Sequence, residues 1–147
     1  MAAEHVAPAP PGTSCVGGDG LVRAAEAAIR ESGADPWRAR WRARRVLEAA
    51  AARGNAEAAC VALRALALAA RELGDLRLAE SHLHRAIRAG AGVPRRLAQA
   101  RMSLVGVRTE LGDPAGALRV ARQAERDLPP EDRAALAVQR AIALVRL

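Results

Sequence analysis

The chain of 147 residues contains no lysine, no tyrosine and no phenylalanine, and it has only two tryptophans. Its apolar half consists mainly of alanine, leucine and valine, and such small side chains bury little area each, at roughly 25 cal/mol per Å². A core of this kind needs many closely packed elements instead of a few large anchors. Alanine and leucine favour helices, whereas the residues typical of strands are scarce. We therefore expect an all-α protein.

Two further absences concern cellular location. Cys15 and Cys60 are the only cysteines, too few for a disulfide framework or a cysteine-based zinc site. The chain has no uninterrupted apolar run of about 18 residues, the length that a membrane-spanning helix needs. Its first residues lack the basic and apolar regions of a secretory signal. The sequence therefore predicts a cytoplasmic protein without a membrane span.

Arginine supplies all 23 basic residues, and with 16 acidic residues the net charge is +7. An excess of this sign suits an acidic protein partner or a nucleic acid. It also suits a GC-rich genome, whose codons enrich alanine, arginine, glycine and proline together. Composition alone leaves both interpretations open.

Residues 1–19 are rich in alanine, proline and glycine without any period, and this pattern predicts a disordered leader. From residue 20 onward, apolar residues recur at helical spacing between short Gly, Asp and Pro turns. Asp35, followed by Pro36, is typical of a helix start, and Gly33 of a helix end. The expected helices cover residues 21–32, 36–53, 56–73, 76–89, 95–111, 115–128 and 131–147.

An internal repeat links the central helices. The letters ELGD recur at Glu72–Asp75 and Glu110–Asp113, 38 residues apart, with matching leucines and alanines on either side. The matches are Leu66 with Leu104, Ala79 with Ala117, and Ala86 with Ala124. A helix, a Gly-Asp turn and a second helix at this period are typical of a solenoid.

These residues resemble the tetratricopeptide repeat (TPR), in which a leucine precedes a small residue on the first helix and small residues line the second. Leu66-Ala67, the Gly-Asp turns and Pro129 fit that pattern, and the clearest repeats cover residues 56–90 and 94–129 of a domain spanning 20–147. Arg101 and Arg108 depart from it, because the family usually places aromatic rings there. We expect their stems to be buried and their charged heads to reach water.

The resemblance implies an antiparallel helix-hairpin solenoid of about seven helices. Residues 131–147 would then begin an incomplete repeat without its capping helix, leaving an apolar face of VQRAIALVRL uncovered. The stretches Val61–Arg88 and Pro94–Leu104 also loosely resemble the helical N-terminal region of actinobacterial proteins that end in a caspase-like CHAT domain. That likeness implies a fragment or regulatory part of a larger bacterial protein. Its partner would be an acidic protein or peptide, or a downstream domain of the same polypeptide.

Catalytic chemistry has few candidates. Ser81 and Ser103 lie inside expected helices without a nucleophile motif, and Cys60 has no orienting group beyond His82 or His84. The two histidines are two residues apart, whereas a metal-binding pair on a helix needs a spacing of three or four. We therefore expect no catalytic, cofactor or metal site, and a protein that is not an enzyme.

Binding is the expected activity. In TPR proteins the first helices of successive repeats line a groove that holds peptides or helices. The positions that this resemblance places in the groove are Val61, Arg64, Leu68, Arg71, Gln99, Met102, Gly106 and Thr109. Arg64 and Arg71 share a helix face, so they could clamp an acidic segment, or they could form a solvated surface pair.

The stretch from Asp35 to Val46 carries both tryptophans among five arginines. Trp37, Trp41, Arg44 and Arg45 form a second candidate surface. We expect the two rings to pack against a neighbouring helix with arginines stacked on them; the alternatives are an exposed partner site and a nucleic-acid site. The predicted function is a non-catalytic protein-binding scaffold, and the alternative is a basic helical domain that binds nucleic acid or serves a transcriptional regulator.

Overall fold

The computed structural model describes residues 17–147, which form seven α-helices and no strand. The helices are α1 (Gly18–Glu31), α2 (Pro36–Arg53), α3 (Ala56–Glu72), α4 (Leu76–Ala89), α5 (Pro94–Glu110), α6 (Pro114–Glu125) and α7 (Pro130–Val145). The predicted all-α class is confirmed, and every helix lies within three residues of its expected bounds. Gly18 and Asp19, expected in the leader, belong to α1; the predicted leader otherwise lies outside the described residues, apart from Gly17.

Side-chain caps explain where four helices begin. The side chains of Asp35, Asn55, Asp75 and Asp113 each accept a hydrogen bond from the backbone N–H three residues later, at 2.8–3.0 Å. These bonds satisfy N–H groups that have no partner within the helix. Gly74 and Gly112 precede two of the caps at φ 84° and 81°, a left-handed conformation that favours glycine.

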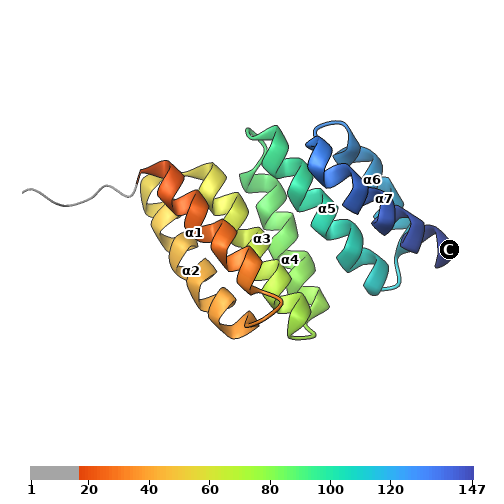
Figure 1. Ribbon diagram of the computed structural model, residues 1–147, viewed down its shortest axis with the longest axis horizontal. Coiled ribbons are helices and arrows are strands. Elements are labelled where there is room, and N and C mark those ends of the chain that lie inside the picture. The colour runs from red at the N-terminus through yellow and green to blue at the C-terminus, as the bar shows by residue number, and fades with distance from the viewer. Residues whose placement is uncertain (1–16) are drawn as a thin grey trace, which may run out of the picture.

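The helices form two layers in one linear array (Figure 1). Within the described residues, α1, α3, α5 and α7 contact one another in sequence and form the odd layer. The even helices α2, α4 and α6 contact odd helices only, each lying against the odd helix before it and the one after it. A one-dimensional array of antiparallel hairpins is therefore the architecture of this chain.

Small residues allow the helices to approach closely. Ala79, Ala86, Ala117 and Ala124, which the repeat pattern predicts at helix contacts, are all fully buried. The largest side chains that are completely enclosed are leucine and valine, together with Cys60. The core thus consists of three hydrophobic clusters spread along the array, joined through partly buried residues such as Ile29 and Ile87. No helix in residues 17–147 has both the length and the hydropathy needed to cross a bilayer.

Candidate functional site

A polar seam joins α3 to α5 across the odd layer. Three residues spaced seven apart on α3 face three residues spaced seven apart on α5, and each pair is separated by 39 positions in the sequence. The pairs are Glu57–Arg96, Arg64–Ser103 and Arg71–Glu110. The first two have nitrogen–oxygen distances of 2.9 Å. Because α3 and α5 run in the same direction, a heptad spacing brings each side chain to its counterpart.

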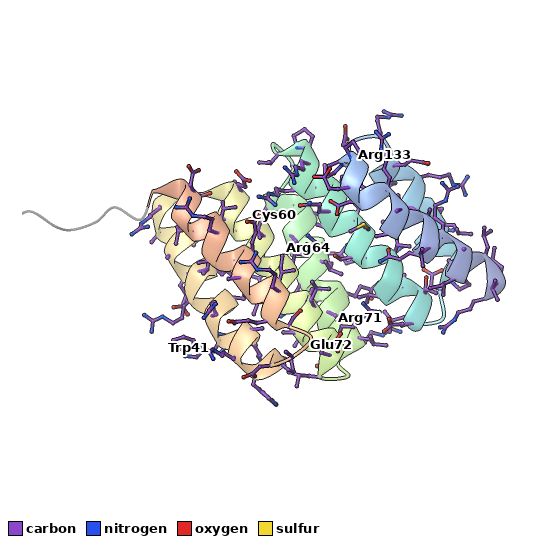
Figure 2. All side chains as sticks on the ribbon, viewed as in Figure 1. Trp41, Cys60, Arg64, Arg71, Glu72 and Arg133 are labelled. Atoms are coloured by element: carbon purple, nitrogen blue, oxygen red, sulfur yellow. The ribbon has the colours of Figure 1, made fainter. Side chains whose placement is uncertain are left out.

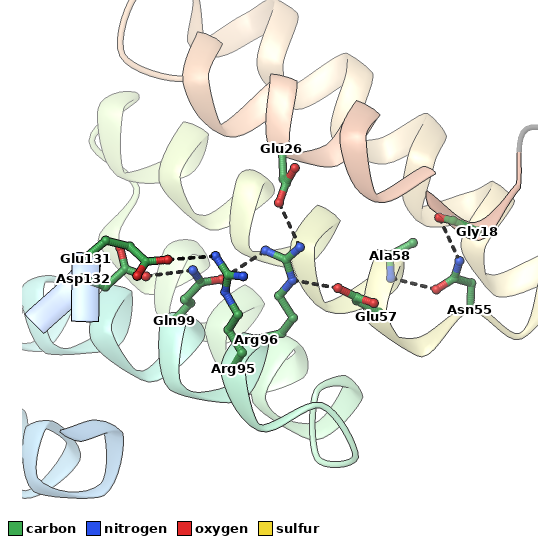
Figure 3. Close-up of polar contacts among 10 residues, drawn as sticks. All are labelled: Gly18, Glu26, Asn55, Glu57, Ala58, Arg95, Arg96, Gln99, Glu131 and Asp132. Carbon is green, nitrogen blue, oxygen red and sulfur yellow. Dashed lines mark hydrogen bonds and ion pairs between the residues drawn. The ribbon is translucent and has the colours of Figure 1, made fainter. Parts of the chain in front are cut away.

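Arg96 extends the seam to the other odd helices (Figure 3). Its Nη2 donates to Glu26 Oε1 of α1 at 2.8 Å, and its Nη1 donates to Gln99 Oε1 at 3.2 Å. Gln99 in turn donates to Asp132 Oδ2 of α7 at 2.8 Å. Burial lowers the pKa of Arg96, but the hydrogen bonds to Glu57 and Glu26 outweigh that effect and raise the pKa above its usual value. Arg96, with Gln99 as the intermediate, thus links α1 to α7 at the two ends of the odd layer.

This seam occupies much of the groove predicted from the TPR resemblance. Val61, Gln99, Met102 and Thr109 are buried between helices, whereas Arg64, Leu68 and Arg71 are partly exposed. Arg64 and Arg71 share a face of α3, as predicted. However, Arg64 donates a hydrogen bond to Ser103, and Arg71 forms an ion pair with Glu110. Desolvation by burial lowers the pKa of Arg64. A ligand carboxylate would have to compete with Glu110 for Arg71.

Sequence reasoning missed this pairing, although a signal was present. Glu57 and Arg96, and again Arg71 and Glu110, have opposite charges at the same offset of 39 residues. That offset is one residue longer than the ELGD repeat. Testing complementary charges at offsets one residue longer or shorter than the repeat period, in addition to identical letters, would have found two of the three pairs.

A small pocket remains open at the end of the predicted groove, between α3, α5 and α7. Its volume is about 170 Å³, and three predicted groove residues line it, namely Arg71, Gly106 and Thr109. A Cβ atom on Gly106 would lie 3.7 Å from Gln139 Nε2, so the missing side chain helps to keep the pocket open. Gln139 Oε1 is buried there without a hydrogen-bond partner. A pocket of this size suits one side chain, not a whole peptide.

The tryptophans occupy an open surface of α2. Trp37 is 66% exposed and Trp41 is 63% exposed, so the expectation that both rings pack against a neighbouring helix is wrong. Figure 2 shows Trp41 at the outer edge of α2. The expected arginine stacking is present: Arg40 lies 5.7 Å from the Trp37 ring centre and Arg45 lies 5.3 Å from that of Trp41. Trp37, Arg40, Trp41 and Arg44 line a shallow depression, and we call these residues with Arg45 the Trp–Arg surface.

The packing of α2 explains this exposure. Ala39, Ala43, Val46 and Ala50 form its only buried stripe, which faces α1 and α3. Within the described residues α2 packs only against α1 and α3, so the tryptophans on its opposite stripe stay exposed. The helical period correctly separated the two faces, but it could not tell which of them would be covered.

Positive charge is concentrated on the even layer. The even helices carry eleven arginines and three glutamates, whereas the odd helices carry ten arginines and eight acidic residues. His82 of α4 responds to this field: burial lowers its pKa, and so do the charges of Arg85, Arg40 and Arg44. The excess positive charge of the chain is therefore not confined to α2 but extends to α4 and α6.

Apolar side chains are exposed along α7. Val138, Ile142, Leu144 and Val145 are each 47–88% exposed, and no helix covers them within the described residues. The predicted uncovered apolar face of VQRAIALVRL is therefore present in the structure.

The residues considered for catalysis are placed as follows. Cys60 is buried, and desolvation raises the pKa of its thiol to about 11, so the thiol stays protonated at neutral pH. Ser103 accepts a hydrogen bond from Arg64 and donates one to the Gln99 carbonyl. His84 lies 3.9 Å from Glu80 on the same helix. Across residues 17–147, no three His, Cys, Asp or Glu side chains lie close enough to hold a metal ion.

Comparison with known proteins finds no matching family model, no matching curated protein and no matching solved structure. The resemblances to the TPR and to CHAT-domain proteins therefore stay predictions.

Proposed function

We propose that this chain is a non-catalytic helical scaffold that binds a protein partner through the Trp–Arg surface of α2. The observation that carries the proposal is the exposure of both tryptophans, at 66% and 63%, side by side in a chain with no other aromatic residue. Tryptophan and arginine are the residues most enriched at the energetic centres of protein interfaces.

The exposed rings offer substantial binding energy. A tryptophan side chain buries about 200 Å², so covering the exposed two-thirds of one indole contributes roughly 3 kcal/mol. The arginines around the rings favour an acidic partner surface, since guanidinium groups bind carboxylates in bidentate fashion. The partner belongs either to a separate protein or to another domain of the same polypeptide.

Binding of nucleic acid through the same surface is the second candidate. The concentration of arginines on the even layer favours it, because phosphate contacts come from such basic surfaces and bases stack on exposed rings. Binding of a protein ranks first, because Arg40 and Arg45 already lie over the two tryptophan rings on which nucleic-acid bases would have to stack.

The test is affinity purification of the tagged chain from its own host cells, with and without Trp37→Ala/Trp41→Ala. We expect a protein partner to be retained by the native chain after nuclease treatment and lost by the double variant. Val138→Ala/Val145→Ala is the matched control, because it removes exposed apolar groups from α7 and should keep the partner.

The purified partner is then titrated against the chain. Trp37 and Trp41 are the only tryptophans of the chain, so its own emission comes from this surface once the emission of the partner alone is subtracted. Binding should shift the emission to shorter wavelength, and the double variant should bind at least about tenfold more weakly in a calorimetric titration. Retention of the same partners by the double variant would refute the proposal, and retention that nuclease abolishes would favour nucleic acid.

A further inference from the structure

A groove separates α4 from α6. These helices make no contact with each other within residues 17–147, and α5 forms the floor between them. Two adjoining depressions of about 280 Å³ each share Arg101 and Gln123. One lies in the groove between α4, α5 and α6, and the other continues from it between α5 and the end of α6. The depression between α4 and α6 also includes Arg108 of α5.

The walls of the groove are basic and its floor is aliphatic. Arg101, Arg119 and Arg126 line it without any hydrogen bond or ion pair to residues 17–147. Ile87 is partly exposed between them, and the buried Leu104 and Val120 lie beneath the floor.

Two acidic groups partly offset this charge. Asp127 is the only acidic residue that lines the groove. Arg108 is committed elsewhere, because its Nε lies 3.4 Å from Glu80 Oε1. Three guanidinium groups therefore remain available for a ligand.

We propose that this groove binds an extended peptide segment in which acidic and aliphatic residues alternate. Such a segment would direct its carboxylates to the free arginines and its aliphatic side chains to the floor. Charge-assisted bonds from arginine to carboxylate are about twice as strong as neutral ones, and the floor adds apolar burial that a purely acidic chain cannot use. The site is distinct from the Trp–Arg surface, since the two share no residue.

Nucleic acid fits the groove less well. Single-stranded nucleic acids bind by stacking bases on aromatic rings within a basic channel. Both tryptophans of the chain lie on α2, outside the groove, and His84 is the one aromatic ring that lines it, beside aliphatic groups. The apolar floor therefore favours a peptide over a phosphate backbone.

The experiment measures the fluorescence anisotropy of a labelled peptide of alternating glutamate and leucine with the full chain. A glutamate-only peptide of equal charge and a single-stranded DNA oligonucleotide serve as comparison probes. We expect Arg101→Gln/Arg126→Gln to weaken binding of the alternating peptide by at least about tenfold. The matched control is Arg23→Gln/Arg30→Gln, which removes the same charge from exposed positions of α1 and should change binding less than about twofold.

Two further variants make the result specific. Gln123→Phe leaves the charge unchanged and fills the junction of the two depressions, so it should also weaken binding. Trp37→Ala/Trp41→Ala should leave it unchanged, which separates this proposal from that of the α2 surface. Equal losses in both arginine pairs, equal binding of the glutamate-only peptide, tighter binding of DNA, or loss in the tryptophan variant would each overturn the proposal.

Discussion

At the scale of single residues, the contact between α4 and α3 leaves no spare room at Gly90. A Cβ atom on Gly90 would lie 2.7 Å from Cys60 Sγ and 3.2 Å from the Ala86 carbonyl oxygen. The backbone of Gly90, at φ −84°, suits any residue, so the constraint is the packing and not the conformation.

We therefore expect Gly90→Ala to lower the free energy of unfolding by about 1–3 kcal/mol, the usual cost of overpacking. Urea denaturation would measure it. Gly33→Ala is the control, because no atom lies within 4 Å of the added methyl, and it should be neutral or slightly stabilising. Adding Cys60→Ala should relieve part of the Gly90→Ala penalty in a double-mutant cycle, whereas strictly additive effects would contradict this contact.

Ionisation of the Cys60 thiol should make the free energy of unfolding depend on pH. Burial raises its pKa from 9.0 to about 11, against the opposing charges of Arg64 and Arg96. The unfolded chain ionises first, so the native state loses stability as the pH rises from 9 towards 11.

We expect alkylation of Cys60 at pH 8 to be at least about a hundredfold slower in the native protein than in urea, because two pKa units reduce the thiolate fraction by that factor. Mass spectrometry of the Cys60 peptide measures the rate. Cys60→Ala should also reduce the loss of stability between pH 9 and 11. Similar alkylation rates in the two states would show that the thiol is neither buried nor perturbed.

At the scale of elements, the sequence predicted the helices well because their boundaries depend on local chemistry. Asn55 and Asp75 cap the next helix whatever surrounds them, and Gly74 ends the previous one. Which face of a helix is buried was harder to predict, because the helical period shows which residues share a face but not which face another helix covers. The tryptophan stripe of α2 was therefore expected to cover the helix at residues 21–32 or an adjacent one, whereas the helices that contact α2 pack on its opposite stripe.

The same limit applied to the candidate groove. Gln99 and Thr109 lie on the predicted face of α5, yet they are buried, because α7 and α3 close over them. The polar seam and the groove between α4 and α6 depend on pairs of residues about 20 to 40 positions apart, which no local pattern specifies.

The seam predicts a difference between two adjacent arginines. Arg96 is 12% exposed and bonds to Glu26 and Glu57, whereas Arg95 is 58% exposed and pairs with the equally open Glu131. Arg96→Met should lower the unfolding free energy by about 2 kcal/mol, since it strands two carboxylates that lose charged hydrogen bonds. Arg95→Met should change it by less than about 1 kcal/mol. Thermal and urea unfolding would measure both, and equal effects would mean that Arg96 does not connect the layer.

At the scale of the whole molecule, stability should vary along the array. Each helix contacts only near neighbours, so the free energy of unfolding is spread over local interfaces. α3 contributes ten buried residues, whereas α7 contributes only Leu136 and Ala143. The α7 end should therefore open without unfolding the central hairpins.

Hydrogen exchange tests this directly. We expect the amides of α7 to exchange faster than those of α3. Removing the α7 anchor with Leu136→Ala, a change that costs about 2–5 kcal/mol in a rigid core, should accelerate exchange in α7 while α3 stays protected. Val138→Ala is the matched control, because Val138 is 60% exposed and should affect neither helix. Uniform acceleration through α3 would instead show a single cooperative unit, and the Asp132–Gln99–Arg96 contacts would then be strong enough to couple α7 to the rest of the odd layer.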